Sequence, residues 1–569
     1  MSTGAQKIVE TLIESGVDHV FGIPGGATGA IFNAFHGREE VKIVLARHEQ
    51  SAAVMADVHG RLTGRPAVVM GQGPFIGTSA GFGIMEAYTS HSPMLAITDT
   101  SDNEFWQSGP TQGATGEYGT PDLLAMLRAM TKYTTLATTP NEAVLGVKLA
   151  LKHSLAGAPG PSAVLLKTMA SFGEFDPKVN PSAYSVEGYM NNDTGMSSPD
   201  GVDTLVKALI EADFPVIIAG NGVHLSKAHE ELSELAEYFS IPIATTYKGK
   251  SAIEETHPLA IGPSGVFGLE VSNKTISQAD LVLVVGSRLR PQGITSKFQK
   301  LLDPSKQRIF QIDIETRNAG WTVPIELGLI GDLKLVLRQI LDVAKSENID
   351  LLSREQKIKS IASLKEELCF MDDSPGLTSD QIPILPQRLV RLLQETVDPI
   401  TMITLDAGHN RTWMHHFYQS QKPLTFLNPG GMAGMGWSIP AAIGAKIVQP
   451  RRPVMAITGD GGFVMTAHSI STAVQYDIPI VIVVMNDSGL GMVREAQRPN
   501  VVASDFIPTN HAKIGESFGA WGVQVDDPKD VPAALQDAFA AGKPAVVDVL
   551  IDQNEKFAPF RTGLSEFGR

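Results

Sequence analysis

The 569-residue sequence contains a single cysteine, Cys369, so no disulfide bond can form within the chain. This scarcity is typical of proteins from a reducing compartment, and we expect a cytoplasmic location. The sequence also lacks any apolar run of about eighteen residues, which argues against a membrane-spanning helix. Residues 1–20 are typical of an amphipathic helix with charges of both signs rather than of a signal peptide.

Basic residues are outnumbered, with 46 Lys and Arg against 61 Asp and Glu and a formal net charge of −15. This balance argues against nucleic acid and anionic membranes as partners, because both attract basic surfaces. It does not define the substrate, since a local site can have the opposite charge. The 54 glycines and 35 prolines are spread over the chain and indicate many tight turns rather than disorder.

The chain is too long for one hydrophobic core, and we expect three domains of about 170–190 residues each. Short apolar segments alternate with helical patterns throughout, which favours parallel sheets covered by helices on both faces. The predicted fold class is therefore α/β, with three consecutive doubly wound parallel-sheet domains at residues 1–175, 200–345 and 385–552. A loop rich in Pro, Asn and Gly at residues 175–201 is the predicted first linker.

Predicted strands and helices support this division. In the first domain we expect strands at 41–45, 67–70 and 94–98 and helices at 50–63 and 79–90. The second should contain strands at 215–219, 241–245, 281–285 and 308–312, followed by a charged helix at 353–367. In the third we expect strands at 402–405, 454–458, 480–485 and 545–551.

Two acidic motifs end predicted strands of the third domain. Strand 454–458 is followed by Gly459-Asp460-Gly461-Gly462, and strand 480–485 by Asn486-Asp487-Ser488-Gly489. Parallel strands deliver their carboxyl ends to one edge of a sheet, so Asp460 and Asp487 should meet there. Carboxylates suit Mg²⁺, and glycine amides at a helix start suit phosphate. The alternative is that Gly-Asp-Gly is only a turn that ends a strand. The presence of a second acidic motif at the same sheet edge argues against this alternative.

This pair of motifs resembles the signature of thiamine diphosphate enzymes of the acetohydroxyacid synthase, pyruvate oxidase and pyruvate decarboxylase superfamily. The resemblance implies thiamine diphosphate and Mg²⁺ as cofactors, with the side chains of Asp460 and Asp487 and the carbonyl of Gly489 as metal ligands. Asp487 is a departure, because most members have asparagine there. The extra negative charge should weaken binding of an anionic cofactor unless a cation compensates, and Asn-Asp resembles catabolic acetolactate synthases.

A second segment that resembles the family lies in the first domain. Strand 41–45 is followed by Arg47-His48-Glu49-Gln50, which resembles the acetohydroxyacid synthase segment with the catalytic glutamate. The resemblance implies that Glu49 hydrogen-bonds the pyrimidine ring of the cofactor and so promotes loss of the proton on thiazolium carbon 2. A carboxyl group in an apolar pocket has a raised pKa, which suits such proton sharing. The alternative is a first-turn glutamate favoured by the helix dipole.

Further cofactor-binding residues follow from the resemblance. Met435 would support the bent cofactor, although methionine also fills ordinary core gaps, and the Ala433 carbonyl would accept from the amino group of the pyrimidine. His409 and Asn410 would face the diphosphate. The complete set of implied cofactor-binding residues is Pro24, Gly73, Pro74, Gly408, His409, Asn410, Ala433, Met435, Gly459, Asp460, Gly461, Gly462, Asp487, Gly489, Leu490, Gly491 and Met492.

Among known reactions the sequence is most similar to acetolactate synthases, which decarboxylate pyruvate and transfer the acyl unit to a second carbonyl. Two side chains of the biosynthetic enzymes are missing, because Gly119 stands for a glutamine and Ala496 for a tryptophan. Benzaldehyde-lyase-like carboligation, simple 2-oxo acid decarboxylation and acetyl transfer to phosphate therefore remain alternatives. The substrates are expected to be small 2-oxo acids or aldehydes.

The second domain resembles the nucleotide-carrying domain of the family, which holds FAD in some members and is empty in others. Gly220-Asn221-Gly222 and Gly286-Ser287-Arg288 fit that fold, whereas residues 289–292 depart from the flavin pattern, so FAD stays open. An NAD enzyme needs a fuller glycine motif. A catalytically inactive paralogue is a further alternative, against which retention of the key residues argues. The resemblance implies a homodimer or homotetramer with active sites shared between chains.

Overall fold

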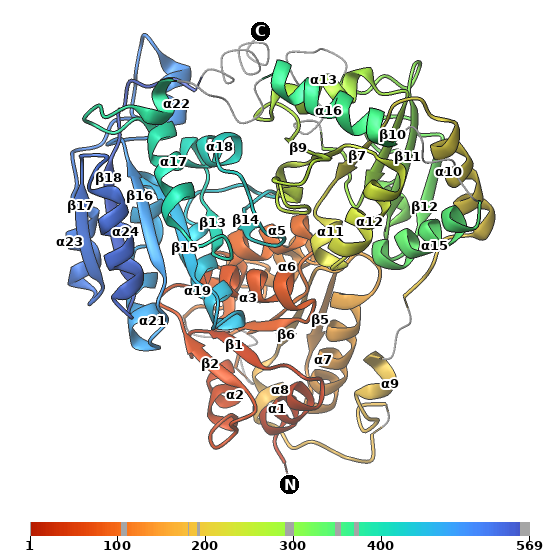
Figure 1. The fold of residues 1–569 in the computed structure, drawn as a ribbon. Coiled ribbons are helices and arrows are strands. Elements are labelled where there is room, and N and C mark those ends of the chain that lie inside the picture. The colour runs from red at the N-terminus through yellow and green to blue at the C-terminus, as the bar shows by residue number, and fades with distance from the viewer. Residues whose placement is uncertain are drawn as a thin grey trace.

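The computed structural model describes residues 2–103, 111–179, 181–190, 194–290, 301–347, 354–368 and 375–557. It contains three parallel six-stranded sheets, each covered by helices (Figure 1). The predicted α/β class with three parallel-sheet units is confirmed. Each sheet lies within one of the three ranges predicted as domains, and we propose those ranges as the domain boundaries. Among the described helices, none is both long enough and apolar enough to cross a membrane.

The first sheet has the strand order β2-β1-β3-β4-β6-β5. Its strands are β1 His19–Gly22, β2 Lys42–Leu45, β3 Ala67–Met70, β4 Met94–Asp99, β5 Tyr133–Ala137 and β6 Pro161–Leu166. The accompanying helices are α1 Gly4–Glu14, α2 Thr28–Ala34, α3 Glu49–Thr63, α4 Gly73–Gly77, α5 Gly81–Ser90, α6 Leu123–Met130, α7 Pro140–Leu155 and α8 Thr168–Phe172, with α9 Glu187–Met190 in the linker. The turns after β1, β2 and β3 lie side by side, because these strands are neighbours in register.

The third sheet repeats this plan, with the order β14-β13-β15-β16-β18-β17. Its strands are β13 Met402–Leu405, β14 Phe426–Leu427, β15 Val454–Gly459, β16 Val481–Asn486, β17 Trp521–Val525 and β18 Ala545–Leu550. The helices are α17 Pro386–Thr396, α18 His409–Phe417, α19 Ser438–Val448, α20 Asp460–Thr466, α21 Ser469–Gln475, α22 Gly491–Gln497, α23 His511–Ser517 and α24 Val531–Ala540. The turns after β13, β15 and β16 therefore emerge at one edge.

The central sheet has a different order, β12-β11-β10-β7-β8-β9. This is the doubly wound order of dinucleotide-binding folds, whose ligands bind where the order reverses, here between β7 and β10. The strands are β7 Pro215–Ala219, β8 Ile243–Thr245, β9 Ala260–Pro263, β10 Leu281–Val285, β11 Arg308–Asp313 and β12 Leu327–Ile330. The helices are α10 Pro199–Glu211, α11 Gly222–Leu225, α12 His229–Phe239, α13 Glu270–Gln278, α15 Leu333–Ser346 and α16 Arg354–Glu367, with short 3₁₀ turns at Tyr247–Gly249, Thr316–Asn318 and Pro375–Thr378.

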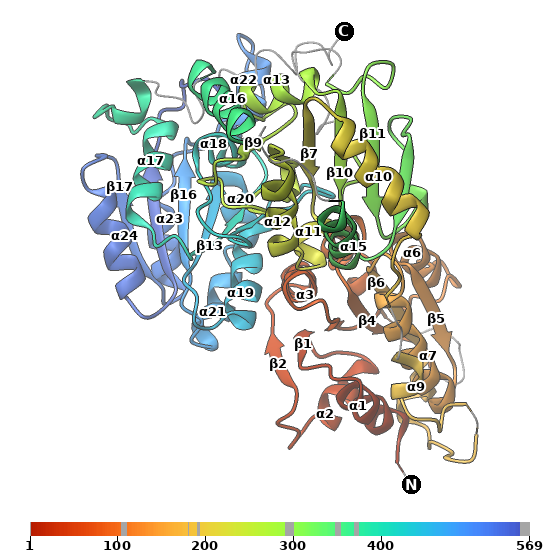
Figure 2. The ribbon, with the colours of Figure 1, turned by 45° about the vertical axis from the view of Figure 1, so that its right-hand side comes forward.

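Helix α3 joins the first and third sheets into one hydrophobic core. It begins one residue earlier than predicted, at Glu49, and ends at Thr63, where Gly64 caps it in the left-handed conformation (φ 73°) that suits glycine. Apart from its first turn and last residue it is buried, and it packs against α19 in a cluster that includes residues of both sheets. Figure 2 shows α3 between the first sheet and the rest of the chain. The shared core fixes how the two sheets face each other within a chain.

A buried ion pair connects the central and third units. The Lys250 ammonium donates to both carboxylate oxygens of Glu255 at 2.7 Å, and the two residues are 0% and 1% exposed. The Glu255 carboxylate also accepts from the backbone amide of Ser420 at 2.6 Å. No solvent reaches these two charges, so each is stabilised by the other. Removal of one would leave the other charge buried without a partner.

We predict that Lys250→Met lowers the stability of the chain by about 3–5 kcal/mol, because it leaves the Glu255 carboxylate buried without its cation. The double variant Lys250→Met/Glu255→Gln should recover part of this loss, since no uncompensated charge remains. Thermal unfolding of the wild type and both variants measures the effect. An unchanged melting temperature for Lys250→Met would show that the pair contributes nothing.

Candidate active site in the third sheet

A cavity of about 230 Å³ lies at the carboxyl edge of the third sheet. It is bordered by the turns that follow β13, β15 and β16 and by the loop that precedes α19. The sequence-predicted residues along its wall are Gly408, His409, Asn410, Met435, Gly459, Asp460, Gly461, Gly462, Asp487, Gly489, Leu490, Gly491 and Met492. Strand order thus brings together residues from four separate segments of the chain.

Two buried carboxylates meet in this cavity. Asp460 is the first residue of α20 and Asp487 follows β16, and the amide of Asp487 donates to Asp460 Oδ2 at 3.1 Å. Burial raises the pKa of Asp460, and burial together with the charge of Asp460 raises the pKa of Asp487 to about 7. Both groups ionise fully only when a cation compensates them. Hard oxygen ligands in a cleft of this kind fit Mg²⁺.

Arg494 compensates the charge of Asp487 and was not found by sequence reasoning. The residue is 4% exposed, with Nη1 3.5 Å from Asp487 Oδ2 and Nη2 donating to the Asp487 carbonyl at 3.0 Å. The cost of aspartate in place of asparagine is therefore partly offset by a neighbour on the next helix, α22. The position of Arg494 one turn into that helix after the Asn-Asp motif is a signal that could have identified it.

A second group of residues that the sequence analysis did not identify lies next to Asp460. His511 Nε2 lies 3.9 Å from Asp460 Oδ1, and the Nδ1 atom of the same ring lies 3.2 Å from Asp548 Oδ1. Asp548 also accepts from the side chain of Asn486 at 2.9 Å. All of these groups are buried. Each lies on a different strand or helix, and no sequence spacing connects them.

Glycine is required where the backbone borders the carboxylates. A β-carbon on Gly491 would overlap Asp487 Oδ2, and one on Gly461 would lie 2.9 Å from the Leu490 side chain and 3.5 Å from the Met435 sulfur. Side chains at these positions would fill the cavity. The glycines therefore leave room and exposed amides for an anionic group beside the cation site.

The turns of the first sheet are organised by Asp99, another residue that sequence reasoning missed. It lies buried at the end of β4 and accepts from the amide of Gly73 at 2.7 Å and from the amide of Ala27. Burial raises the pKa of this carboxyl. Asp99 thus ties the Gly73-Pro74 turn to the loop that contains Pro24. An aspartate directly after a buried strand is the signal, as for Asp460.

Glu49 begins α3 at the edge where these turns emerge, with its side chain half-buried. In the described part of the chain, the Glu49 carboxylate makes no hydrogen bond or ion pair. Neither Glu49 nor Pro24, Gly73 or Pro74 borders the cavity of the same chain. The structure therefore places the predicted residues in two groups, one on each of the two related sheets.

The segment before α19 lies between two cavities. Met435 borders the cavity just described, whereas Ala433, with a φ of 54°, borders a second one. Asp406 fixes the end of this segment, because its buried carboxylate accepts from the amides of Gly436 at 2.8 Å and Ser438 at 3.2 Å. Asp406 directly follows β13 and repeats the strand-end aspartate pattern.

The second cavity, of about 280 Å³, lies where the order of the central sheet reverses. The turns Asn221-Gly222 and Gly286-Ser287 border it, together with the cations Lys248, Arg288, Arg290 and Arg411. Lys248 Nζ is buried and has no hydrogen-bond partner among the described residues. Burial lowers its pKa well below the usual value. These cations fit an anionic ligand. Of residues 289–292, which differ from the flavin-binding pattern in sequence, 291 and 292 lie outside the described part of the chain.

The sequence was compared with known protein families and proteins. It matches the thiamine pyrophosphate enzyme N-terminal TPP binding domain over residues 2–122, the central domain over 202–340 and the C-terminal TPP binding domain over 406–549. A probable acetolactate synthase large subunit of Methanocaldococcus jannaschii is 33% identical over 97% of this chain and 92% of its own length. The acetolactate synthase large subunit of Haemophilus influenzae is 28% identical over 98% and 96%.

These matches follow the chain in the order of its three sheets, and the cavity with Asp460 and Asp487 lies within the C-terminal TPP binding domain. The relatives cover nearly the whole chain, so the match is not confined to one sheet. The chain belongs to the thiamine pyrophosphate enzymes.

Proposed function

We propose that the chain is a thiamine diphosphate-dependent carboligase like acetolactate synthase, which decarboxylates a 2-oxo acid such as pyruvate and joins the acyl unit to a second carbonyl. The observation on which this depends is the pair of buried carboxylates Asp460 and Asp487 in a glycine-lined cavity. The full-length relatives named acetolactate synthase large subunits support the choice of reaction. The single cysteine fits the cytoplasmic location that we also propose.

Each group of residues has a task in this proposal. Asp460, Asp487 and the Gly489 carbonyl would hold Mg²⁺, and the turns at 408–410 and 459–462 would hold the diphosphate. Thiamine diphosphate supplies the nucleophilic carbon and the electron sink when it is bound. Glu49 would hold a proton at the pyrimidine ring, and Met435 would support the cofactor from the cavity wall. The residues of the chain thus bind, bend and activate a cofactor that performs the bond-breaking chemistry.

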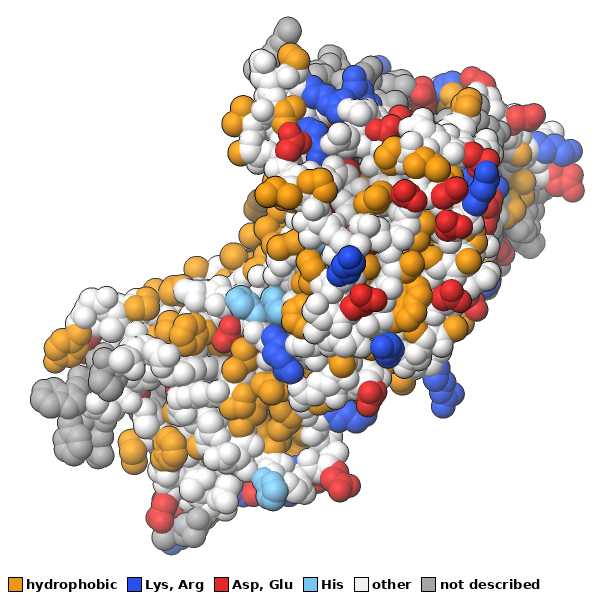
Figure 3. Space-filling view, turned by 90° about the vertical axis from the view of Figure 1, so that its left-hand side faces the viewer, with side chains coloured by type: hydrophobic (Ala, Val, Ile, Leu, Met, Phe, Trp, Pro, Cys, Tyr) orange, Lys and Arg blue, Asp and Glu red, His pale blue; other side chains and the backbone are white. Residues whose placement is uncertain are grey.

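We propose further that two copies of the chain share each active site, as a homodimer or a tetramer built from such dimers. The Glu49 group and the Asp460 group lie on different sheets, and the Glu49 group does not border the cavity of its own chain. Large apolar side chains are exposed near that cavity, with Val464 at 60% and Met465 at 50%. Hydrophobic side chains also gather along the hollowed face between the two lobes (Figure 3). Such surfaces are typical of interfaces.

We predict that Glu49→Gln lowers the rate of hydrogen–deuterium exchange at carbon 2 of bound thiamine diphosphate by about 10²–10⁴-fold, the range for loss of a general acid–base group. Affinity for the cofactor should change little, since Glu49 makes no contact with the metal site. Nuclear magnetic resonance of quenched samples measures the exchange. Glu40→Gln, at an exposed position before the same strand, is the matched control. Normal exchange in Glu49→Gln would remove Glu49 from this role.

The same variant tests whether chains share active sites. Glu49→Gln and Asp460→Asn should each be inactive alone, but a mixed dimer of the two contains one site with both native residues. Co-expression with two affinity tags isolates the mixed dimer. Activity in that species, absent from either parent, supports sharing. An inactive mixed dimer that still binds cofactor would contradict it.

We predict that Asp487→Asn removes the pH dependence of Mg²⁺ binding near neutrality. The pKa of Asp487 is raised to about 7, so below that pH a proton competes with the cation, and wild-type affinity should rise as pH increases from 6 to 8. Asparagine has no proton to release, so its affinity should be nearly constant across this window. The Mg²⁺-dependent increase in melting temperature, measured at several pH values, reports the difference. Complete loss of binding in Asp487→Asn would show that the second carboxylate is indispensable.

The reaction itself is tested with a panel of 2-oxo acids and aldehydes followed by mass detection of products. Acetolactate from pyruvate alone is the expected result. Gly119 and Ala496 lack the bulky side chains of biosynthetic enzymes, so larger partners could enter as well. Formation of free aldehyde, of acetyl phosphate, or of aromatic hydroxyketones would instead identify one of the alternative reactions.

We propose that the central cavity holds a nucleotide with a diphosphate group, FAD being the form found in some members of the family. Three arginines at this cavity support an anionic ligand, and the buried Lys248 side chain, whose pKa burial lowers, would be charged most readily beside such an anion. Lys248→Met should weaken nucleotide binding about tenfold or more, because a buried charged contact is lost, whereas Lys207→Met on the exposed face of α10 should have no effect. A visible absorption spectrum identifies flavin, and calorimetry with ADP tests binding without it. Failure of both ligands to bind would contradict the proposal.

A further inference from the structure

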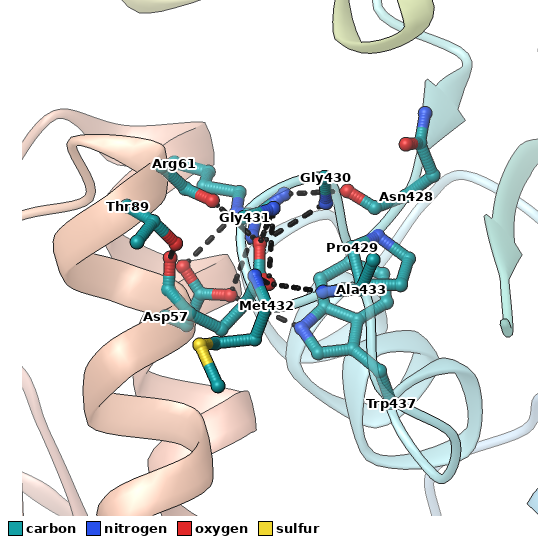
Figure 4. Close-up of polar contacts among 12 residues, drawn as sticks. Asp57, Arg61, Thr89, Asn428, Pro429, Gly430, Gly431, Met432, Ala433 and Trp437 are labelled. Carbon is teal, nitrogen blue, oxygen red and sulfur yellow. Dashed lines mark hydrogen bonds and ion pairs between the residues drawn. The ribbon is translucent and has the colours of Figure 1, made fainter. Parts of the chain in front are cut away.

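The segment 429–437 forms a wall between the two cavities. Gly430 and Ala433 border the central cavity, and Met435 borders the cavity with the paired carboxylates. Figure 4 shows this segment next to Asp57, Arg61 and Thr89, which lie on helices of the first unit. The position of Met435 is therefore set where residues of different units meet.

Glu86 on α5 binds one side of this wall. Its carboxylate is completely buried and accepts from four consecutive backbone amides. The nitrogen–oxygen distances are 3.2 Å for Gly430, 3.1 and 3.2 Å for Gly431, 2.7 Å for Met432 and 3.2 Å for Ala433. Successive amides that point at one anion form a nest, and a carboxylate is strongly held there. Burial raises the pKa of Glu86, but the charges of Arg61 and Lys248 and the hydrogen bonds from Ser90 and the Met432 amide together lower it to about 2.

Arg61 holds Glu86 in place and reaches the wall itself. It donates to Glu86 Oε1 at 2.9 Å, to both oxygens of Asp57 at 2.9 and 2.8 Å, and to the Asn428 carbonyl at 2.9 Å. Trp437 donates from its indole nitrogen to Asp57 Oδ2 at 3.1 Å, and the Arg61 guanidinium lies over its ring. The same buried network therefore contacts the residues on both sides of the wall.

The wall depends on these contacts for its conformation. Four glycines occur in it, at 430, 431, 434 and 436, and Ala433 has a φ of 54°, which is costly for a residue with a β-carbon. At the far end, the Asp406 carboxylate holds the amides of Gly436 and Ser438. Met435 thus lies between two fixed points, each made by a buried carboxylate. A sequence so rich in glycine would not keep this shape unaided.

We propose that Glu86, held by Arg61, is a positioning residue for the reaction, because it fixes Ala433 and Met435 where the bent cofactor needs them. This inference rests on the proposed function of the site. Glu86 does not border the cavity of the paired carboxylates, so it acts only through the wall. If Glu86 only connected the units, its replacement would lower the stability of the protein but would not slow proton loss from bound cofactor.

The decisive variant is Glu86→Gln, which keeps the size of the side chain but removes its charge and turns an amide group toward the backbone donors. We expect kcat and carbon 2 exchange to fall about 10²-fold, the effect of misplacing a reacting group by about 1 Å. KM and the affinity for Mg²⁺ should stay near wild-type values. Glu255→Gln is the matched control, because Glu255 is an equally buried, ion-paired tie between units whose carboxylate bonds Lys250 and Ser420 and no residue of the wall.

Gly431→Ala provides a second variant that leaves all charges intact. Its β-carbon would overlap Thr89 Oγ1, so the wall must move while Glu86 remains ionised. The same loss of kcat and exchange, with KM retained, supports the proposal even if Glu86→Gln does not fold. Full exchange in a folded Gly431→Ala or Glu86→Gln protein overturns it, as does an equal loss in Glu255→Gln. Absence of exchange in the wild type would instead contradict the proposed function itself.

Discussion

The two carboxylates at the end of β15 and β16 cannot both be charged unless a cation lies between them, and much of the third unit follows from that constraint. Burial raises both pKa values and the charge of Asp460 raises that of Asp487 further, so the pair holds a proton more readily than ordinary aspartates do. Glycines 461 and 491 keep side chains away, and Arg494 balances the extra charge that Asp487 brings. The site is thus organised to gain most of its electrostatic stabilisation when a metal and an anion bind together.

The first and third sheets have the same strand order, and they use the same device to shape their loops. In each, a buried aspartate at a strand end accepts backbone amides from neighbouring turns, Asp99 in the first and Asp406 in the third. Within one chain, α3 and α19 join the two sheets through a common core. That intrachain contact leaves the Glu49 edge away from the chain's own cavity, which is the observation behind the proposal that another copy completes the site.

Strand ends were predictable from sequence because buried parallel strands are continuous apolar runs, and the polar residues after them must lie at one edge. This reasoning found the Asp460 and Asp487 turns and the start of α3 within one residue. It missed seven strands, β1, β5, β6, β9, β12, β14 and β17. Five of these are sheet edges, of which β14 has two residues and β5, β12 and β17 are only partly buried. The other two, β1 and β6, are buried strands inside the first sheet. It also missed Glu86, Arg61 and His511, since their partners are hundreds or tens of residues away and depend on the assembled topology.

The wall between the cavities explains how a central unit without a direct part in the chemistry still supports it. Arg290 borders the central cavity and donates to the carbonyls of Gly430 and Gly431 at 2.9 and 3.1 Å, while Glu86 binds the amides of the same residues. The two faces of one peptide segment are therefore held by different units. Without the central unit, the carbonyls of Gly430 and Gly431 would lose their hydrogen bonds to Arg290. The glycine-rich segment would then not keep its conformation by itself. Packing between units is in this way a condition for the geometry of the reaction site.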